Sequence, residues 1–223
     1  MLFRSKDGVL IPSGVGRYVA HTITGARYVE LDGNANGLEP EDIDEVGDEI
    51  QEFLTGTRPR VDHDRVLATI LFTDVVDSTQ HTVELGDRRW RDLIARHDDV
   101  VRRHLREFRG VEVNTMGDAF LARFDGPARA VQCAVAIRDA LRPLGVEIRS
   151  GVHTGEIELV DDDVSGIAVT ISKRIETIAP PGQVLVSRTV VDLVAGSGIE
   201  FVDRGEQELK GVPGMWRLFA VAN

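Results

Sequence analysis

The sequence predicts an α+β fold with a ferredoxin-like (split βαβ) core, added C-terminal strands and a small N-terminal segment. Strand-like and helix-like stretches alternate as β-α-β-β-α-β over residues 66–152, and more apolar strands follow them. The 223 residues exceed one ordinary domain of about 100–200 residues. Residues 55–64 combine Gly, Pro and charge without an apolar period, which is typical of a linker. We therefore expect one unit over residues 1–60 and another over 65–223.

The core elements follow from their periodicities. Residues 66–73 form an apolar run typical of a buried strand. Apolar and histidine positions keep helical spacing over 83–108, which predicts one long helix. A tight Thr-Met-Gly-Asp turn separates two strand patterns and predicts a hairpin. The hairpin strands at 111–114 and 119–124, a helix over 126–142 and a strand over 146–152 complete the core.

The flanking elements are shorter. After the core we expect a helix over 167–179, a strand over 184–186, a short helix over 188–195 and a closing hairpin of residues 208–212 and 216–221. In the N-terminal segment, residues 26–31 alternate like a strand, and residues 41–54 form an acidic amphipathic helix. This segment has too few large apolar residues to bury a core of its own.

Composition excludes several classes of function. Asp and Glu number 37 against 26 Lys and Arg, a net charge of −11 that repels nucleic acid, so no nucleic-acid partner is expected. No apolar run is long enough for a membrane span, and no signal peptide pattern begins the chain, so we expect a cytoplasmic protein. The single cysteine, Cys133, lies among small apolar residues and is interpreted as a core residue.

Two aspartates stand where strands end. Asp74 follows the strand over 66–73, and Asp118 lies in the hairpin turn. In a split βαβ fold these strands are neighbours, so the carboxylates can converge to about 5 Å. Close carboxylates repel each other unless a divalent cation such as Mg²⁺ or Mn²⁺ joins them, and two ions can clamp a reacting phosphoryl group. The backbone N–H groups of residues 76–79 could hold phosphate oxygens. The alternative is that each aspartate caps a turn, which is the more common role of an aspartate in that position.

Four ordered motifs carry a family resemblance. Residues 71–79 (LFTDVVDST), 114–122 (NTMGDAFLA), 151–156 (GVHTGE) and 208–212 (ELKGV) together resemble the class III adenylate/guanylate cyclase catalytic domain, particularly its mycobacterial form. The resemblance covers about residues 65–221. It implies a lyase that converts a nucleoside triphosphate to a 3′,5′-cyclic monophosphate and pyrophosphate, at sites formed in a head-to-tail homodimer.

The resemblance also assigns roles. Asp74 and Asp118, with Val75, match the metal-binding positions for two Mg²⁺ or Mn²⁺ ions per site. Arg174 matches the arginine that stabilises charge developing at the α-phosphate. The nucleotide-binding positions are Asp77, Ser78, Thr79 and Lys210, of which Lys210 contacts the triphosphate from the other subunit.

Two positions depart from the family pattern. Adenylate cyclases usually have Lys where this chain has Asn114, and the partner base-reading position falls on Asp163. An amide offers both a donor and an acceptor, so base discrimination is expected to be looser, with ATP the default substrate and GTP possible. Thr170 replaces the asparagine that orients the ribose, and a hydroxyl offers one donor in place of two, so turnover is expected to fall.

The N-terminal segment is similar to another family. Residues 11–20 and 25–31 resemble the C-terminal end of α/β-hydrolases, which some mycobacterial cyclases carry before the cyclase domain. No Gly-x-Ser-x-Gly motif and no catalytic histidine accompany them, so hydrolysis is not expected. Residues 1–60 are interpreted as a truncated remnant or a regulatory arm.

The sequence thus predicts a metal-dependent adenylate cyclase that acts in cAMP signalling. A second hypothesis, based on Asn114 and Thr170, is a catalytically weak cyclase-homology module that binds nucleotide or a partner domain in a regulatory role. A third is another phosphoryl transfer in a palm-like fold.

Overall fold

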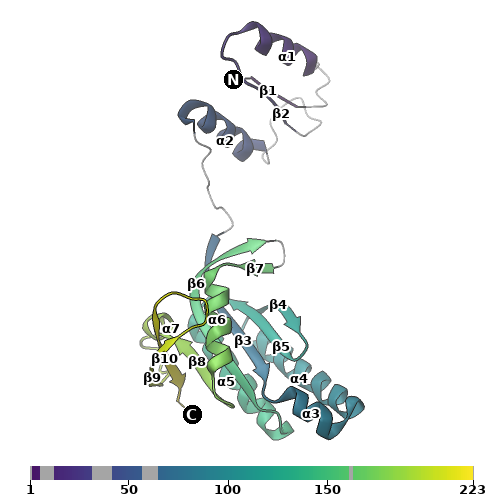
Figure 1. Cartoon of the computed structure of the whole chain (residues 1–223), viewed down its shortest axis with the longest axis vertical. Coiled ribbons are helices and arrows are strands. Elements are labelled where there is room, and N and C mark those ends of the chain that lie inside the picture. The colour runs from purple at the N-terminus through teal and green to yellow at the C-terminus, as the bar shows by residue number, and fades with distance from the viewer. Residues whose placement is uncertain (1, 6–12, 32–41, 57–64, 161–162, 223) are drawn as a thin grey trace. The chain divides into compact units, whose positions relative to one another are not determined.

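The computed structural model describes residues 2–5, 13–31, 42–56, 65–160 and 163–222. It divides into two compact units, Met1–His63 and Asp64–Asn223, and each is described by itself (Figure 1). Most of the predicted linker, residues 57–64, lies outside the described residues. No helix in the described ranges is both long and apolar enough to cross a membrane.

The first unit pairs two short strands in parallel. β1 (Leu2–Ser5) pairs with β2 (Tyr28–Leu31), and α1 (Ser13–Thr22) connects them in sequence. α1 lies close to β2 because Gly16 has no side chain: a Cβ there would be 2.6 Å from Cε2 of Tyr28. α2 (Asp42–Thr55) follows, and Glu49 on it pairs with Arg27 at 3.0 Å. The strand and α2 occur where expected, whereas α1 was not predicted. The hydrolase resemblance of this unit stays a prediction.

The second unit is built on an eight-stranded mixed sheet. Its strand order is β4-β5-β3-β6-β8-β10-β9, with β7 paired to the outer part of β6. All neighbours are antiparallel except β6 and β8. The strands are β3 (Arg65–Val75), β4 (Val111–Met116), β5 (Ala119–Phe124), β6 (Ile148–Val160), β7 (Asp163–Ser165), β8 (Val184–Ser187), β9 (Phe201–Glu208) and β10 (Met215–Val221). The predicted β-α-β-β-α-β core with added strands is confirmed.

Helices cover both faces of this sheet. α4 (Asp87–Glu107), α5 (Pro127–Leu141) and α7 (Arg188–Leu193) pack with Leu71 and Val75 of β3 on one face. α6 (Ile167–Ile178) crosses the opposite face, where it contacts β3 and β6 (Figure 1). Ile70 and Phe72 belong to that second face. β3 is therefore buried on both sides, which explains its continuous apolar run.

α6 is held very close to the sheet. Gly151 of β6 lies directly under it, and a Cβ at this residue would be 2.3 Å from the backbone nitrogen of Glu176. Gly155, further along β6, would place a Cβ 2.9 Å from Cβ of Ala168. The hydroxyl of Ser172 donates to the carbonyl oxygens of Ile70 and Gly151, at 2.9 and 3.0 Å. These contacts fix the position of α6 on β3 and β6.

Three boundary predictions were wrong. The helix expected over 83–108 is two helices, α3 (Ser78–Leu85) and α4, because Gly86 between them has a φ of 77° that ends the first. The closing hairpin is formed by β9 and β10, and residues 209–214 are its turn, with positive φ at Gly211 and Gly214. The strand expected over 146–152 continues to Val160, where it pairs with β7.

Candidate active site

The ends of β3 and β5 form one rim of the sheet. Thr73 is paired with Phe120, and continuing this register places Val75 opposite Asp118. Val76 donates its backbone N–H to the Glu147 carbonyl at 2.9 Å. Because successive residues of an antiparallel strand direct their backbone polar groups to opposite sides, the backbone of Val75 faces the β5 side. The carbonyl of Val75 therefore points toward the side of the sheet on which the β4–β5 turn carries Asp118.

Asp74 is ion-paired to an arginine of β6. Nε and Nη2 of Arg149 donate to Oδ2 of Asp74 at 3.2 and 2.6 Å, and the two residues are cross-strand partners. The hydrogen bond to Asp74 is the main cause that raises the pKa of the Arg149 guanidinium above its ordinary value. Arg149 is 75 residues away from Asp74 in sequence and adjacent to it in space, so no pattern in the sequence indicates this ion pair.

Asp118 has a buried oxygen that nothing satisfies. Its Oδ2 is enclosed and has no hydrogen-bond partner among the residues that the structure describes. Asp118 lines a hollow of about 360 Å³ with Thr79 of α3 and with Trp90 and Ile94 of α4. A buried carboxylate oxygen without a partner is costly, and a bound cation would satisfy it.

The start of α3 lies between Asp74 and Asp118. Ser78, Thr79 and Val83 line the Asp118 hollow and also a second hollow of about 570 Å³, which Asp74, Val75, Asp77 and Arg149 line. Asp77 has a φ of 54° and makes no side-chain cap bond, so it is not the capping residue that a turn aspartate usually is. The first backbone N–H groups of α3 have no acceptor within the helix. The N–H of Val76, in contrast, is used by Glu147 and is not available to a phosphate.

The residues at this rim fit a divalent metal. No three His, Cys, Asp or Glu side chains gather into a ligand cluster anywhere in the described ranges. Mg²⁺ is ordinarily held by one or two carboxylates, with substrate phosphates and water completing its octahedron. The unsatisfied Oδ2 of Asp118 and the Val75 carbonyl supply oxygens of the kind this ion prefers.

The other candidate residues lie elsewhere in the same chain. Thr170, which is exposed, and Arg174, which is half-buried, stand one turn apart on α6. Nε of Arg174 is enclosed without a hydrogen-bond partner. Lys210 is exposed in the β9–β10 turn and lines a hollow of about 560 Å³ that shares no residue with those at Asp74 and Asp118. The structure therefore brings the two aspartates to one rim but does not bring Lys210 to it.

The predicted base-reading residues are on β4 and β7, two strands that contact each other. Asn114 is exposed, and Asp163 is exposed with one oxygen accepting the N–H of Val164 at 2.8 Å. β4 has a bulge between Glu112 and Asn114.

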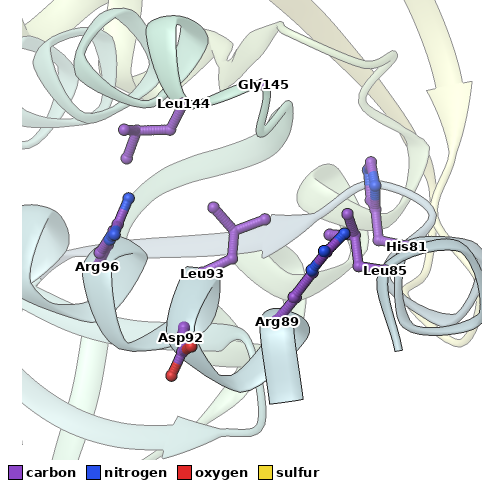
Figure 2. Close-up of a pocket in the computed structure, with 8 residues that line it drawn as sticks. All are labelled: His81, Leu85, Arg89, Asp92, Leu93, Arg96, Leu144 and Gly145. Carbon is purple, nitrogen blue, oxygen red and sulfur yellow. The ribbon is translucent and has the colours of Figure 1, made fainter. Parts of the chain in front are cut away.

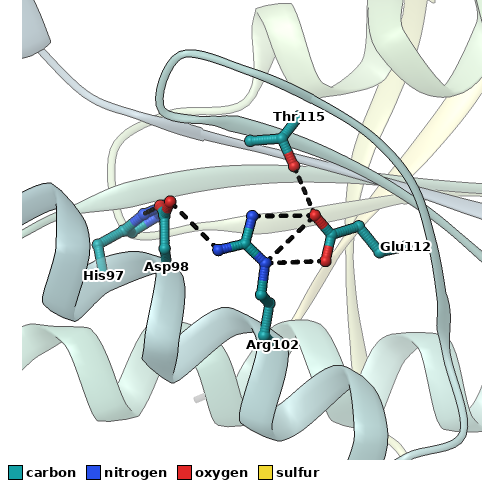
Figure 3. Close-up of polar contacts among 5 residues, drawn as sticks. All are labelled: His97, Asp98, Arg102, Glu112 and Thr115. Carbon is teal, nitrogen blue, oxygen red and sulfur yellow. Dashed lines mark hydrogen bonds and ion pairs between the residues drawn. The ribbon is translucent and has the colours of Figure 1, made fainter.

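A clamp next to Asn114 ties β4 to α4. Figure 3 shows the side chain of Arg102 between two carboxylates. Arg102 donates to both oxygens of Glu112, at 3.0–3.3 Å, and more weakly to Asp98 at 3.4 Å. Thr115 donates to Glu112 at 2.8 Å. The Arg102 hydrogen bond is the main cause that lowers the pKa of Glu112. This clamp spans the bulge, so it fixes the backbone on both sides of Asn114.

A separate hollow lies between α3, α4 and the 3₁₀ turn Arg142–Leu144 (Figure 2). It measures about 430 Å³, and three leucines form much of its wall. Arg89 and Arg96 reach along it, whereas the carboxylate of Asp92 points away from Leu93 and the two arginines. It shares no lining residue with the hollows at Asp74 and Asp118.

Sequence reasoning missed Arg149 and Glu176. Arg149 lines the Asp74 hollow, and its Nε lies 2.7 Å from Oε1 of Glu176, a wholly buried residue of α6. Arg149 lies two residues before the motif of residues 151–156, and Glu176 lies in the helix expected over 167–179, but no spacing rule links either residue to Asp74. Arg149 faces Asp74 only because of the register between β3 and β6, and that register is known from the structure and not from the sequence.

Comparisons with known proteins bear on the second unit. A family model described as the adenylate and guanylate cyclase catalytic domain matches residues 61–222. A Rhizobium meliloti protein provisionally named adenylate cyclase 3 is 31% identical over an alignment of 166 residues, and the match covers 66% of this chain and 27% of that protein. An uncharacterised Mycobacterium tuberculosis protein is 32% identical over an alignment of 151 residues, and the match covers 65% of this chain and 52% of that one. The chain thus spans about a quarter to a half of these relatives.

Solved structures agree with the fold. The adenylyl cyclase CyaB from P. aeruginosa superposes with a TM-score of 0.67 at 21% identity, covering 71% of this chain and 95% of that one. A protein described as an adenylate/guanylate cyclase/hydrolase from Silicibacter pomeroyi gives a TM-score of 0.63 at 27% identity, covering 71% and 98%. The sheet order and the matched family model over residues 61–222 lead to one assignment: this chain belongs to the class III adenylate and guanylate cyclase catalytic domain family.

Proposed function

We propose that this chain is a divalent-metal-dependent adenylate cyclase that converts ATP to 3′,5′-cyclic AMP and pyrophosphate. The observation that carries the proposal is the placement of Asp74 and Asp118 at the ends of neighbouring strands in a cyclase domain, with a buried Asp118 oxygen that has no partner. The family generally uses divalent metals. Here Mg²⁺ or Mn²⁺, two ions per site, would be held by Asp74, Asp118 and the Val75 carbonyl.

Each group at the rim has a task in this reaction. Ions held by Asp74, Asp118 and the Val75 carbonyl would supply Lewis-acid polarisation of the triphosphate and of the attacking 3′-hydroxyl. The first N–H groups of α3 and the hydroxyls of Ser78 and Thr79, which line the Asp74 hollow, would donate hydrogen bonds to phosphate oxygens, and the positive end of the helix dipole would favour these anions. Arg149 adds a cation beside Asp74. Catalysis of this kind is mostly positioning and charge neutralisation.

A second copy of the chain completes the proposed site. Lys210 lines a hollow apart from the rim, and Thr170 and Arg174 lie on α6. A head-to-tail homodimer would bring these groups of one copy to the aspartates of the other. Arg174 then meets the charge that develops at the α-phosphate, and its enclosed Nε, which has no acceptor, gains one.

Base selection is assigned to Asn114 and Asp163. Asp163 keeps an oxygen that can accept from the N6 amino group of adenine, and the amide of Asn114 offers a donor and an acceptor. ATP is therefore the proposed substrate, with GTP as the competing one.

The test is a product assay. The purified chain is incubated with Mn²⁺ or Mg²⁺ and with ATP or GTP, and cyclic nucleotide is measured. We expect cyclic AMP from the wild type, a loss of at least 100-fold in Asp74→Ala, and no loss in Asp99→Asn, which removes an exposed carboxylate of α4. Nucleotide binding without product would instead favour the regulatory cyclase-homology module.

A further inference from the structure

Four side chains of alternating charge run from the rim into the interior under α6. Asp74 accepts from Arg149, Arg149 lies against Glu176, and Glu176 lies against Lys173, with its Oε2 2.6 Å from the Lys173 ammonium. The Lys173 ammonium also lies 5.4 Å from the centre of the Phe72 ring. The chain of charges links β3, β6 and α6 at the point where Gly151 holds the helix against the sheet.

Glu176 is the unusual member of this set. Its side chain is 0% exposed, and a buried carboxylate is strongly disfavoured unless it is well paired. Both of its oxygens have a cation within 2.7 Å, yet neither contact has the alignment of a hydrogen bond. The oxygens of Glu176 can therefore still accept hydrogen bonds from a guanidinium.

Arg149 divides its donors unequally between two carboxylates. Nε and Nη2 both donate to Oδ2 of Asp74, whereas Oε1 of Glu176 lies only 2.7 Å from the same Nε. A small rotation of the guanidinium would transfer its aligned hydrogen bonds from Asp74 to Glu176. The side chain of Arg149 is one-third exposed and lines the hollow beside Asp74, and its Nε already lies within 2.7 Å of Glu176, so the transfer needs little movement.

We propose that Glu176 is a positioning residue, the alternative acceptor that takes the Arg149 guanidinium when a divalent cation binds Asp74. The proposal rests on the metal site of the proposed function. A cation at Asp74 competes with Arg149 for the same carboxylate and repels it. Glu176 gives the guanidinium a second partner within reach, so Arg149 releases Asp74 and still remains beside it.

The proposal predicts that substituting Glu176, which does not contact the metal, lowers the affinity for the metal. In Glu176→Gln the guanidinium has only Asp74 as a charged acceptor, so a cation must break that pair without compensation. We expect Mn²⁺ binding, measured on the full chain by EPR without nucleotide, to weaken by about 10- to 100-fold. Glu156→Gln, an exposed β6 residue with the same charge change, should bind Mn²⁺ as the wild type does.

A double-variant cycle separates positioning from simple charge loss. Once Arg149→Gln has removed the competing cation, adding Glu176→Gln should cost no further Mn²⁺ affinity. If the loss persists at full size in that background, Glu176 acts only through its charge and the proposal is wrong. If Glu176→Gln binds Mn²⁺ like the wild type, the proposal is wrong as well. Failure of the metal site itself is distinguishable, because Asp74→Asn would then leave wild-type Mn²⁺ binding unchanged.

The proposal can also be tested by NMR on the wild-type protein, without substituting the buried Glu176. The Nε–H resonance of Arg149 reports the acceptor of its hydrogen bond. Saturating Mg²⁺, without nucleotide, should shift this resonance, and should not shift it in Asp74→Asn. A resonance that stays in place while Mg²⁺ demonstrably binds at Asp74 would overturn the proposal even if Glu176→Gln fails to fold.

Discussion

The close contact of α6 with Gly151 predicts a large effect from one added methyl group. In Gly151→Ala the new Cβ would be 2.3 Å from the backbone nitrogen of Glu176, 2.5 Å from the carbonyl oxygen of Ser172 and 2.8 Å from Cα of Glu176. Ordinary van der Waals contact begins at 3.4 Å. All three neighbours are backbone atoms, so rotating a side chain cannot relieve the clash. The helix must retreat from β6 by about 1 Å.

Both stability and turnover should respond to this retreat. Overpacking a core by a methyl group costs about 1–3 kcal/mol or more, and here the hydrogen bonds of Ser172 to Ile70 and Gly151 are strained too. A loss of about 3 kcal/mol lowers the Tm of a unit of this size by about 6–12 °C. Arg174 moves with α6, and a displacement of about 1 Å at a reacting group can reduce turnover by about 100-fold.

Gly126→Ala is the matched control. Gly126 has a φ of −160°, which any residue adopts, and a Cβ there would meet no atom within 4 Å. Thermal unfolding and cyclic nucleotide production are measured on both variants. A Gly151→Ala protein that melts with the wild type and turns over at its rate would refute the claim that α6 is fixed by this contact.

Three further results are expected. Burial lowers the pKa of His153 from about 6.5 in the unfolded chain to about 4 in the folded one. Below pH 6.5 the unfolded chain therefore binds a proton that the folded chain does not, so the free energy of unfolding falls as the pH drops from about 6.5 toward about 4. That loss is about 3 kcal/mol and should be absent from urea titrations of His153→Gln. Burial raises the pKa of the Cys133 thiol to about 12, so a disulfide reagent at pH 8 should label it only after denaturation; labelling of the folded chain would contradict this. Arg102→Met and Glu112→Gln should show a coupling of about 0.5–1 kcal/mol in a double-mutant cycle, because the pair is bidentate but about one-third exposed; a coupling of zero would show that the clamp does not hold β4.

The sequence predicts the parts of the fold whose periodicity is strong. β3 is buried on both faces and reads as a continuous apolar run, and α5 keeps its apolar stripe. β9 was not predicted, because all but its first residue are exposed and no alternation marks it. The division between α3 and α4 was also missed. The helical spacing of apolar residues continues across Gly86, and the helix ends there because Gly86 has a positive φ, which the spacing does not reveal.

Part of the candidate site could likewise be predicted from the sequence, and part could not. Asp74 and Asp118 could be placed on one rim, because strand ends and a hairpin turn are visible in sequence and the split βαβ order makes the strands neighbours. The ion pair of Asp74 with Arg149 depends on which residues face each other across β3 and β6, and that register is a tertiary property. The burial of Glu176 likewise depends on how closely α6 approaches Gly151.

The central claim is that the two aspartates of one protomer act with Arg174 and Lys210 of another. Mixing chains that carry Asp74→Ala with chains that carry Arg174→Ala tests it directly, because each inactive homodimer lacks a different half of the site. With random pairing, cyclic AMP production should recover to about a quarter of the wild-type rate, from one intact site in each heterodimer. No recovery in a mixture shown to contain heterodimers would contradict the shared site.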